Sequence, residues 1–242
     1  MSHFNGYPPK SRSATAPRRP RKIEEFEDSR QFLMAIHDAI ESHRNQFFAS
    51  GQPHGNVNTE TVYIGSPSVS SSRKGFLGQS SIIQPMFQSA NVIARTFGKR
   101  PVTLPVDYLD DLESFYYIIA WVSMAYTAPG VRLQTHEFPP ILANWADNSN
   151  PKFSGFEKEA MLRGHGFSAR FNHSLFKQKN LPTADVFEAL MGSFHGILKE
   201  NYEAKWDGNY CHNPAGVYGT ILGWLREAVQ AISNSTSYPG EV

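Results

Sequence analysis

One stretch of the sequence, residues 110–130, constrains the fold more than any other. It reads DDLESFYYIIAWVSMAYTAPG and, after an acidic start, is apolar on every face of a helix. A helix without a polar face is stable only when other elements surround it. Asp110 and Glu113 have the spacing of a capping box, and Pro129-Gly130 ends the run. We therefore predict a buried helix at the axis of a helical domain, too short and too acidic to span a membrane.

Repeating apolar residues predict more helices on both sides of this one. Residues 32–47 carry them at steps of three and four, the pattern of one buried helical face. Asp28 is placed to cap this helix, and Gly51 with Pro53 is placed to end it. His43 lies on the buried face, where a packed, hydrogen-bonded histidine is favoured over a ligand. Further helix starts are predicted at Pro139-Pro140, Ser154, Thr183 and Asn213-Pro214.

Two short runs, TVYIG at 61–65 and KGFLG at 74–78, have strand character and are separated by a polar connector. They predict a small β-hairpin. Residues 79–109 show neither helical nor strand period and contain three prolines, so we expect an extended, partly ordered segment. The predicted fold class is mainly α with one small β-hairpin.

The ends of the chain differ in composition from its centre. Residues 1–22 carry six basic side chains and no acid, although the formal charge of the whole chain is only +1. Such a segment buries too little apolar surface to fold. We predict a basic disordered tail over 1–23, one lobe over 24–233 and a flexible C-terminus over 234–242. The run RRPRK suits a nuclear localisation signal or a nucleic-acid contact, but a solvated leader is favoured.

The single cysteine, Cys211, excludes an internal disulfide and fits a reducing compartment. The N-terminus lacks the apolar core of a signal peptide. We expect an intracellular protein, cytoplasmic or nuclear and not secreted. The adjacent Cys211 and His212 have no further ligands in evidence, so no metal site is predicted.

None of the common enzyme motifs, such as GxGxxG, GxxxxGK[ST], HExxH, GxSxG or CxxC, is intact in the chain. Asp110 and Asp111 could act as a general acid and base. At a helix start, a cap stabilised by the helix dipole is the simpler interpretation.

Five segments nevertheless occur in the order found in one family. They are AIHDAIESH, HGNVNTETVY, KGFLGQSSII, RTFGKRP and DDLESFYYIIAW, within residues 35–121. The series resembles the fungal-type protein kinase family, where a helix is followed by a loop of the type HRDIS with NIL, then GFLIDFDLA, RTGTRPFM and DLESFFYVLLW. The resemblance implies the C-terminal lobe of a protein kinase over about residues 24–230, with the nucleotide-binding N-terminal lobe absent.

The departures from that family pattern bear on catalysis. The resemblance puts Asn56 at the position of the catalytic base, and Thr61 and Gln79 at the two magnesium-binding positions. An amide carries no charge and accepts no proton at neutral pH, and magnesium beside phosphates favours carboxylates. Glu60 is the one candidate for a substitute base. No catalytic site is therefore expected to be intact.

Two matching residues have structural roles in the family. The resemblance implies that Asp111 holds the backbone of the loop through hydrogen bonds and that His54 packs beneath it. We therefore expect a catalytically inactive, pseudokinase-like lobe, without a cofactor, that serves as a scaffold or regulator. Its expected partner is another protein, such as a kinase or an N-lobe-bearing chain.

Apolar surface left by the missing lobe would mark the partner site. The candidate residues are Phe76, Leu77, Ile82, Ile83, Met86 and Phe87, with the alternative that they fold back into the core.

Two other functions remain open. One is a serine/threonine kinase completed by a partner chain, with ATP, magnesium and Glu60 as base. The other is nucleic-acid binding through residues 10–22 alone.

Overall fold

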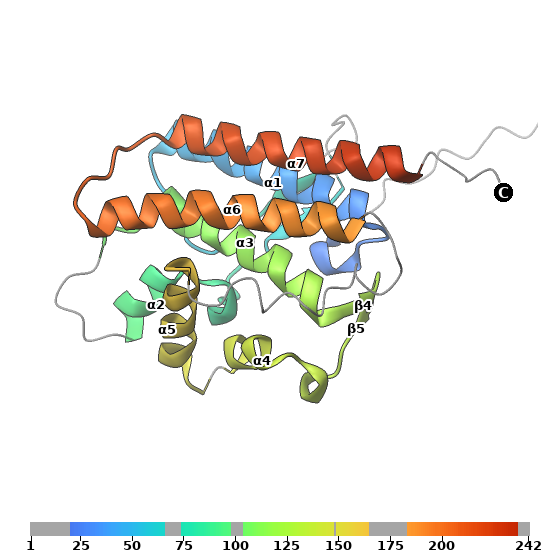
Figure 1. The fold of residues 1–242 in the computed structure, drawn as a ribbon, viewed down its shortest axis with the longest axis horizontal. Coiled ribbons are helices and arrows are strands. Elements are labelled where there is room, and N and C mark those ends of the chain that lie inside the picture. Colours follow the sequence, from blue (N-terminus) through green and yellow to red (C-terminus); the bar gives the residue numbers. More distant parts are fainter. Residues whose placement is uncertain (1–19, 66–73, 98–103, 148, 165–182, 237–242) are drawn as a thin grey trace, which may run out of the picture.

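The computed structural model describes residues 20–65, 74–97, 104–147, 149–164 and 183–236. Within these ranges the protein is mainly helical and carries two small antiparallel sheets, as Figure 1 shows. This confirms the predicted predominance of helices. None of the helices in the described ranges is both long and apolar enough to cross a membrane.

The helices are α1 (Ser29–Ser50), α2 (Ala90–Phe97), α3 (Tyr108–Ala125), α4 (Pro140–Ala146), α5 (Pro151–Leu162), α6 (Thr183–Trp206) and α7 (Pro214–Thr236). The strands are β1 (Arg21–Lys22), β2 (Val62–Ile64), β3 (Gly75–Leu77), β4 (Tyr126–Ala128) and β5 (Val131–Arg132). Three short 3-10 turns complete the order: η1 (Ile23–Glu25), η2 (Pro85–Phe87) and η3 (Thr135–Glu137).

Helix α3 is the axis of the fold, and every one of its residues is buried. It lies between the layer of α1, α6 and α7 and the smaller helices α2, α4 and α5 (Figure 1). Its predicted start was wrong by three residues. Asp107 is the N-cap, and the Asp110 carboxylate accepts the Asp107 N–H at 2.8 Å. Its predicted end was also wrong, because Pro129 and Gly130 form the turn between β4 and β5.

The other predicted helix signals were correct with one exception. The Asp28 side chain accepts the Gln31 N–H, and Gly51 ends α1 with a φ of 70°. Helices α4, α6 and α7 begin at the predicted residues. Helix α5 begins earlier than predicted, because Asn150 caps it and Pro151 takes the first position, while Ser154 is buried inside it.

The predicted hairpin is present as β2 and β3, but β1 adds a third strand to it, with Lys22 opposite Tyr63. The prediction of a disordered tail is therefore wrong from residue 21 onward. Ile23 is fully buried, and this anchor was overlooked beside the basic composition. At the other end α7 continues to Thr236, so residues 234–236 are helical. Residues 1–19 and 237–242 lie outside the described part of the chain.

The segment 79–109 is also more regular than predicted, since it contains η2 and α2. Ser89 accepts the Val92 N–H at 3.0 Å and so caps the start of α2. Helix α2 packs against α5, where Gly155 faces Ile93. A Cβ at Gly155 would lie 2.7 Å from the Ile93 side chain, so the glycine permits this close approach.

Candidate functional site

Residues 54–61, here called the amide loop, connect the end of α1 with β2 and rest on the start of α3. The buried Asp111 carboxylate holds the first residues of this loop. One oxygen accepts the His54 N–H at 2.7 Å and the other accepts the Gly55 N–H at 2.9 Å. Gly55 has a φ of 74°, a conformation that suits glycine. Asp111 is thus an anchor for the loop backbone.

The same carboxylate continues into a buried chain of hydrogen bonds. His43 Nε2 lies 2.9 Å from Asp111 Oδ2, and the Tyr218 hydroxyl lies 2.7 Å from His43 Nδ1. A carboxylate only accepts, so in the neutral imidazole Nε2 carries the hydrogen and Tyr218 donates to Nδ1. This confirms His43 as a packed core histidine. These hydrogen bonds join α1, α3 and α7 directly beneath the amide loop.

The His54 side chain joins the amide loop to the end of β3. Its Nε2 lies 3.1 Å from the Gly78 carbonyl oxygen, and its Nδ1 accepts the Asn56 N–H at 3.3 Å. Both contacts are satisfied by the neutral ring with the hydrogen on Nε2. Burial lowers the pKa of His54 and favours this neutral form.

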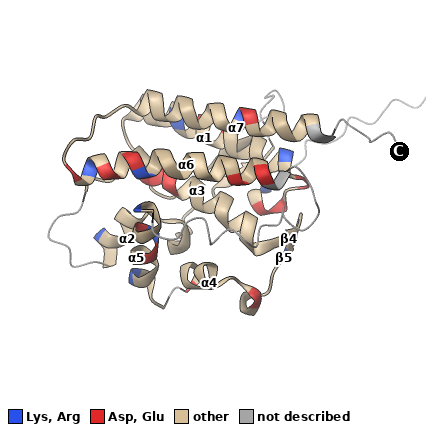
Figure 2. Cartoon of the chain, viewed as in Figure 1, with Lys and Arg blue, Asp and Glu red and all other residues tan. Residues whose placement is uncertain are grey.

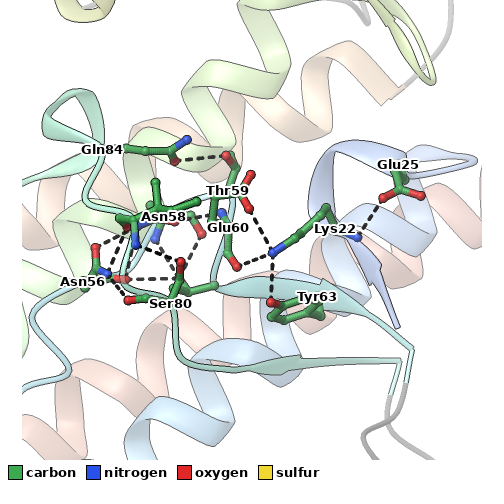
Figure 3. A network of polar contacts seen from close by, with 11 residues as sticks. Lys22, Glu25, Asn56, Asn58, Thr59, Glu60, Tyr63, Ser80 and Gln84 are labelled. Atoms are coloured by element: carbon green, nitrogen blue, oxygen red, sulfur yellow. Dashed lines mark hydrogen bonds and ion pairs between the residues drawn. The ribbon is translucent and has the colours of Figure 1, made fainter. Parts of the chain in front are cut away.

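The Asn56 side chain joins the segment after β3 to Asn58 of the amide loop (Figure 3). Its Nδ2 donates to the carbonyl oxygens of Ser80 at 2.9 Å and Ile82 at 3.1 Å. Its Oδ1 accepts from Asn58 Nδ2 at 2.7 Å. The buried Asn58 also donates to the Ile82 carbonyl and accepts the Glu60 N–H. The nitrogen and the oxygen of both side-chain amides thus have neutral hydrogen-bond partners.

The two residues at the expected magnesium positions are not arranged as ligands. Thr61 is buried, and its hydroxyl accepts the Asn58 N–H at 2.9 Å while lying 3.0 Å from the Asn58 carbonyl oxygen. Gln79 is exposed. Because Asn56 Oδ1 is already engaged and no carboxylate stands at these positions, the residues present do not fit a magnesium ion beside phosphates. Elsewhere in the described ranges no three His, Cys, Asp or Glu side chains cluster in a metal-binding group.

Glu60, the candidate substitute base, forms an ion pair with Lys22 of β1. The Lys22 Nζ lies 3.0 Å from Glu60 Oε2 and donates to the Glu60 carbonyl and the Tyr63 hydroxyl (Figure 3). Burial lowers the pKa of Lys22, but hydrogen bonds to Tyr63 and Glu60 outweigh it and raise the pKa above its ordinary value. Lys22 was missed because it follows a basic run. The apolar Ile23 and Phe26 were the available signal.

The six candidates for a partner site divide into exposed and buried residues. Ile82 and Ile83 are 52% and 63% exposed. Phe87 belongs to the core, so its candidacy was wrong. The other three are half-buried: Leu77 and Met86 pack against the core, and Phe76 stacks on the Tyr63 ring. The alternative of folding back is thus correct for Phe87.

A second polar cluster, here called the buried clamp, consists of Glu113 of α3 and Lys158 of α5. The Lys158 Nζ donates to the carbonyls of Met86 at 2.8 Å and Gln88 at 2.6 Å. Glu113 Oε1 accepts the Ala90 N–H at 2.9 Å. Burial lowers the pKa of Lys158 to about 7 and raises that of Glu113 to about 7. The clamp fixes the chain from η2 to the start of α2.

Asp110 and Asp111 do not form an acid and base pair. Asp110 closes the capping box of α3 and accepts from Ser89, Asn91 and Tyr202. Burial raises the pKa of Asp110. Each of the two carboxylates is occupied by hydrogen bonds of the fold.

Comparisons with protein-family models, with curated proteins and with solved structures gave no match. The resemblance to fungal-type protein kinases therefore rests on the five sequence segments and stays a prediction. In Figure 2, positive and negative residues are interspersed along α6 rather than gathered by sign. Residues 10–19, on which a nucleic-acid function depends, lie outside the described part.

Proposed function

We propose that this chain is a catalytically inactive lobe, related to the C-terminal lobe of fungal-type protein kinases, that binds another protein as a scaffold or regulator. The order of long helix, His-initiated loop, hairpin and buried helix supports the relationship. So do the hydrogen bonds from the His54 and Gly55 N–H groups to Asp111, the role that the resemblance implies for that residue.

One observation carries the proposal of inactivity. At the position where the family has its catalytic base, Asn56 donates its amide hydrogens to the Ser80 and Ile82 carbonyls. An aspartate in this conformation would place one carboxylate oxygen against both of these carbonyl oxygens, while its other oxygen could still accept from Asn58 Nδ2. The geometry of residues 80–82 therefore depends on the amide and leaves no proton acceptor there.

The competing function is a serine/threonine kinase completed by a partner chain, with ATP and magnesium as cofactors. It requires Glu60 to act as the base, and the ion pair with Lys22 weighs against this. A base must reach the hydroxyl of the substrate, whereas this carboxylate is only 29% exposed and is directed at Lys22.

Binding of nucleotide separates these two functions. A ligand present at 100 times its Kd stabilises a protein by about 2.7 kcal/mol. We expect no shift of the melting temperature with ATP and magnesium at millimolar concentration. A saturable shift would contradict the proposal and favour the partner-completed kinase.

The partner face is proposed at Ile82 and Ile83, which are exposed side by side on the segment held by Asn56. The test is crosslinking within cells. We expect proteins that crosslink to the wild-type chain to be absent from the crosslinked products of the double variant Ile82→Ser and Ile83→Ser. Val131→Ser is the matched control, because Val131 is 54% exposed and opens β5, in the other sheet. Equal loss in both variants would show that Ile82 and Ile83 are not the binding face.

A further inference from the structure

A cavity of about 310 Å³ lies between the start of α1 and the sheet of β1, β2 and β3. Three cationic side chains, Arg21, Arg30 and Lys74, line it together with one acid, Asp28. Met34 and Ile64 contribute apolar wall. The cavity thus combines positive charge with an apolar surface large enough for one side chain of a ligand.

Some charged groups of this cavity have partners within the protein, and others do not. Glu27 lies 2.8 Å from Arg21 and balances it, and the Asp28 carboxylate accepts the Gln31 N–H as the cap of α1. Arg30 and Lys74 are exposed, and neither side chain has an ion pair within the part of the chain that the structure describes. These two cations are available to a ligand.

The cavity is separate from the amide loop. Successive residues of a strand point to opposite faces, so Lys22 reaches Glu60 while its neighbour Arg21 lines the cavity. Ligand binding here consequently does not depend on whether the amide loop is catalytic.

We propose that this cavity binds an acidic side chain of a partner peptide, with its oxyanion at Arg30 and Lys74 and its stem against Met34 and Ile64. The acids beside the cavity are Asp28, Glu27 and Asp38, whose carboxylate accepts the Lys74 backbone N–H at 2.6 Å, and together they balance the three cations. An oxyanion would therefore be held by direct contact with the side chains of Arg30 and Lys74 rather than by a net charge. Arg30 offers two parallel N–H donors to such an oxyanion, and Lys74 a mobile ammonium. The oxyanion is a carboxylate or a phosphate.

Calorimetric titration with blocked tripeptides tests this proposal at low salt. The peptides are Ala-Glu-Ala, Ala-phosphoserine-Ala and, as the uncharged match, Ala-Gln-Ala. We expect saturable binding of an acidic peptide that weakens with salt. The acidic peptide that binds more tightly, with glutamate or with phosphoserine, shows whether the oxyanion is a carboxylate or a phosphate.

The variants Arg30→Ala and Lys74→Ala together should weaken that binding about 5-fold, since exposed ion pairs contribute about 0.2–1 kcal/mol each. Arg226→Ala, on the exposed face of α7, is the matched control and should leave it unchanged. Equal binding of the glutamine peptide, equal loss with Arg226→Ala, or no saturation at millimolar peptide would each overturn the proposal. The response of the melting temperature to ATP and magnesium should be the same in these variants as in the wild type. Failure of this proposal is therefore distinguishable from failure of the proposed inactive lobe.

Discussion

The amide loop and the buried clamp hold backbone segments in opposite ways. Asn56 and Asn58 hold residues 80–82 with neutral amides. Glu113 and Lys158 hold residues 86–90 with ionisable groups that are fully buried. A buried amide needs only hydrogen-bond partners, whereas a buried charge also loses its hydration. Neutral groups thus hold the segment after β3, whereas buried ionisable groups tie η2 and the start of α2 to α3 and α5.

The largest effect is expected where the amide loop depends on a charge. Asp111→Ala removes the acceptor for His54, Gly55 and His43 at once. An unpaired buried donor costs about 1–3 kcal/mol, so the three donors left by Asp111→Ala should reduce the free energy of urea unfolding by about 3 kcal/mol or more. Asp207→Ala, at the exposed end of α6, is the control and should change stability by less than about 0.5 kcal/mol. A similar small loss at Asp111 would mean that the loop is held by other contacts.

Lys158→Met tests the clamp through its pH dependence. Because the pKa of Lys158 falls from 10.5 to about 7 on folding, the unfolded chain binds the extra proton between these values. The free energy of unfolding should therefore rise with pH from 7 towards 10.5 through this group, and Lys158→Met should lack that rise.

At high pH, where Lys158 is neutral, Lys158→Met should be less stable than wild type by about 1–3 kcal/mol, since it leaves two carbonyls unpaired. Lys152→Met, on the exposed side of α5, should keep the wild-type slope. Glu113 gives the opposite dependence. Because folding raises the pKa of Glu113 from 4.5 to about 7, the free energy of unfolding should fall as pH rises between these values, and Glu113→Gln should lack that fall.

Asn56→Asp replaces a neutral amide of the amide loop with a carboxylate. It therefore removes the difference between the neutral amide loop and the ionisable buried clamp. The new carboxylate would face the Ser80 and Ile82 carbonyls, and we expect a loss of about 1–3 kcal/mol without any gain of phosphotransferase activity. The loss should shrink in acid, where the new group is protonated and can donate. Asn45→Asp, exposed on α1, should be near neutral. Measurable phosphate transfer by Asn56→Asp would refute the proposed role of the amide.

The smallest effect concerns His54, whose ring joins the amide loop to the end of β3. Burial lowers its pKa below 6.5, so its stabilising contribution is complete above that pH and is lost as pH falls below it. The free energy of unfolding should therefore rise with pH between pH 5 and neutrality, and this rise should be shallower in His54→Gln than in the wild type. An NMR titration of His54 with a midpoint above the ordinary value would contradict the neutral ring.

Much of the helical fold could be predicted because its signals are local. Asp28 and Gly51 bound α1 as predicted, and Pro214 opens α7. The failures share a different origin. Asp107 displaced Asp110 as the cap of α3, and Ile23 ordered a basic segment by burial. Cap choice and burial depend on neighbours distant in the chain, which composition does not reveal.

The candidate site was predicted only as a set of positions. That Asn56 and Thr61 lack a carboxylate is legible in the sequence. The partners of Asn56 are not, because the β2–β3 hairpin brings Ser80 and Ile82, which are distant along the chain, to its side chain. Lys22 escaped notice for the same reason, since its partner Glu60 lies 38 positions away along the chain.

The sequence by itself determined that the chain is mainly helical around one buried helix, and that positions 56, 61 and 79 carry two amides and a hydroxyl. Hydrophobic periodicity and side-chain chemistry are properties of the residues themselves. Only the tertiary structure decided how those groups are used: Asn56 holds residues 80–82, Lys22 pairs with Glu60, and Lys158 is buried. These outcomes depend on which carbonyls and charges the packed chain brings within hydrogen-bonding distance.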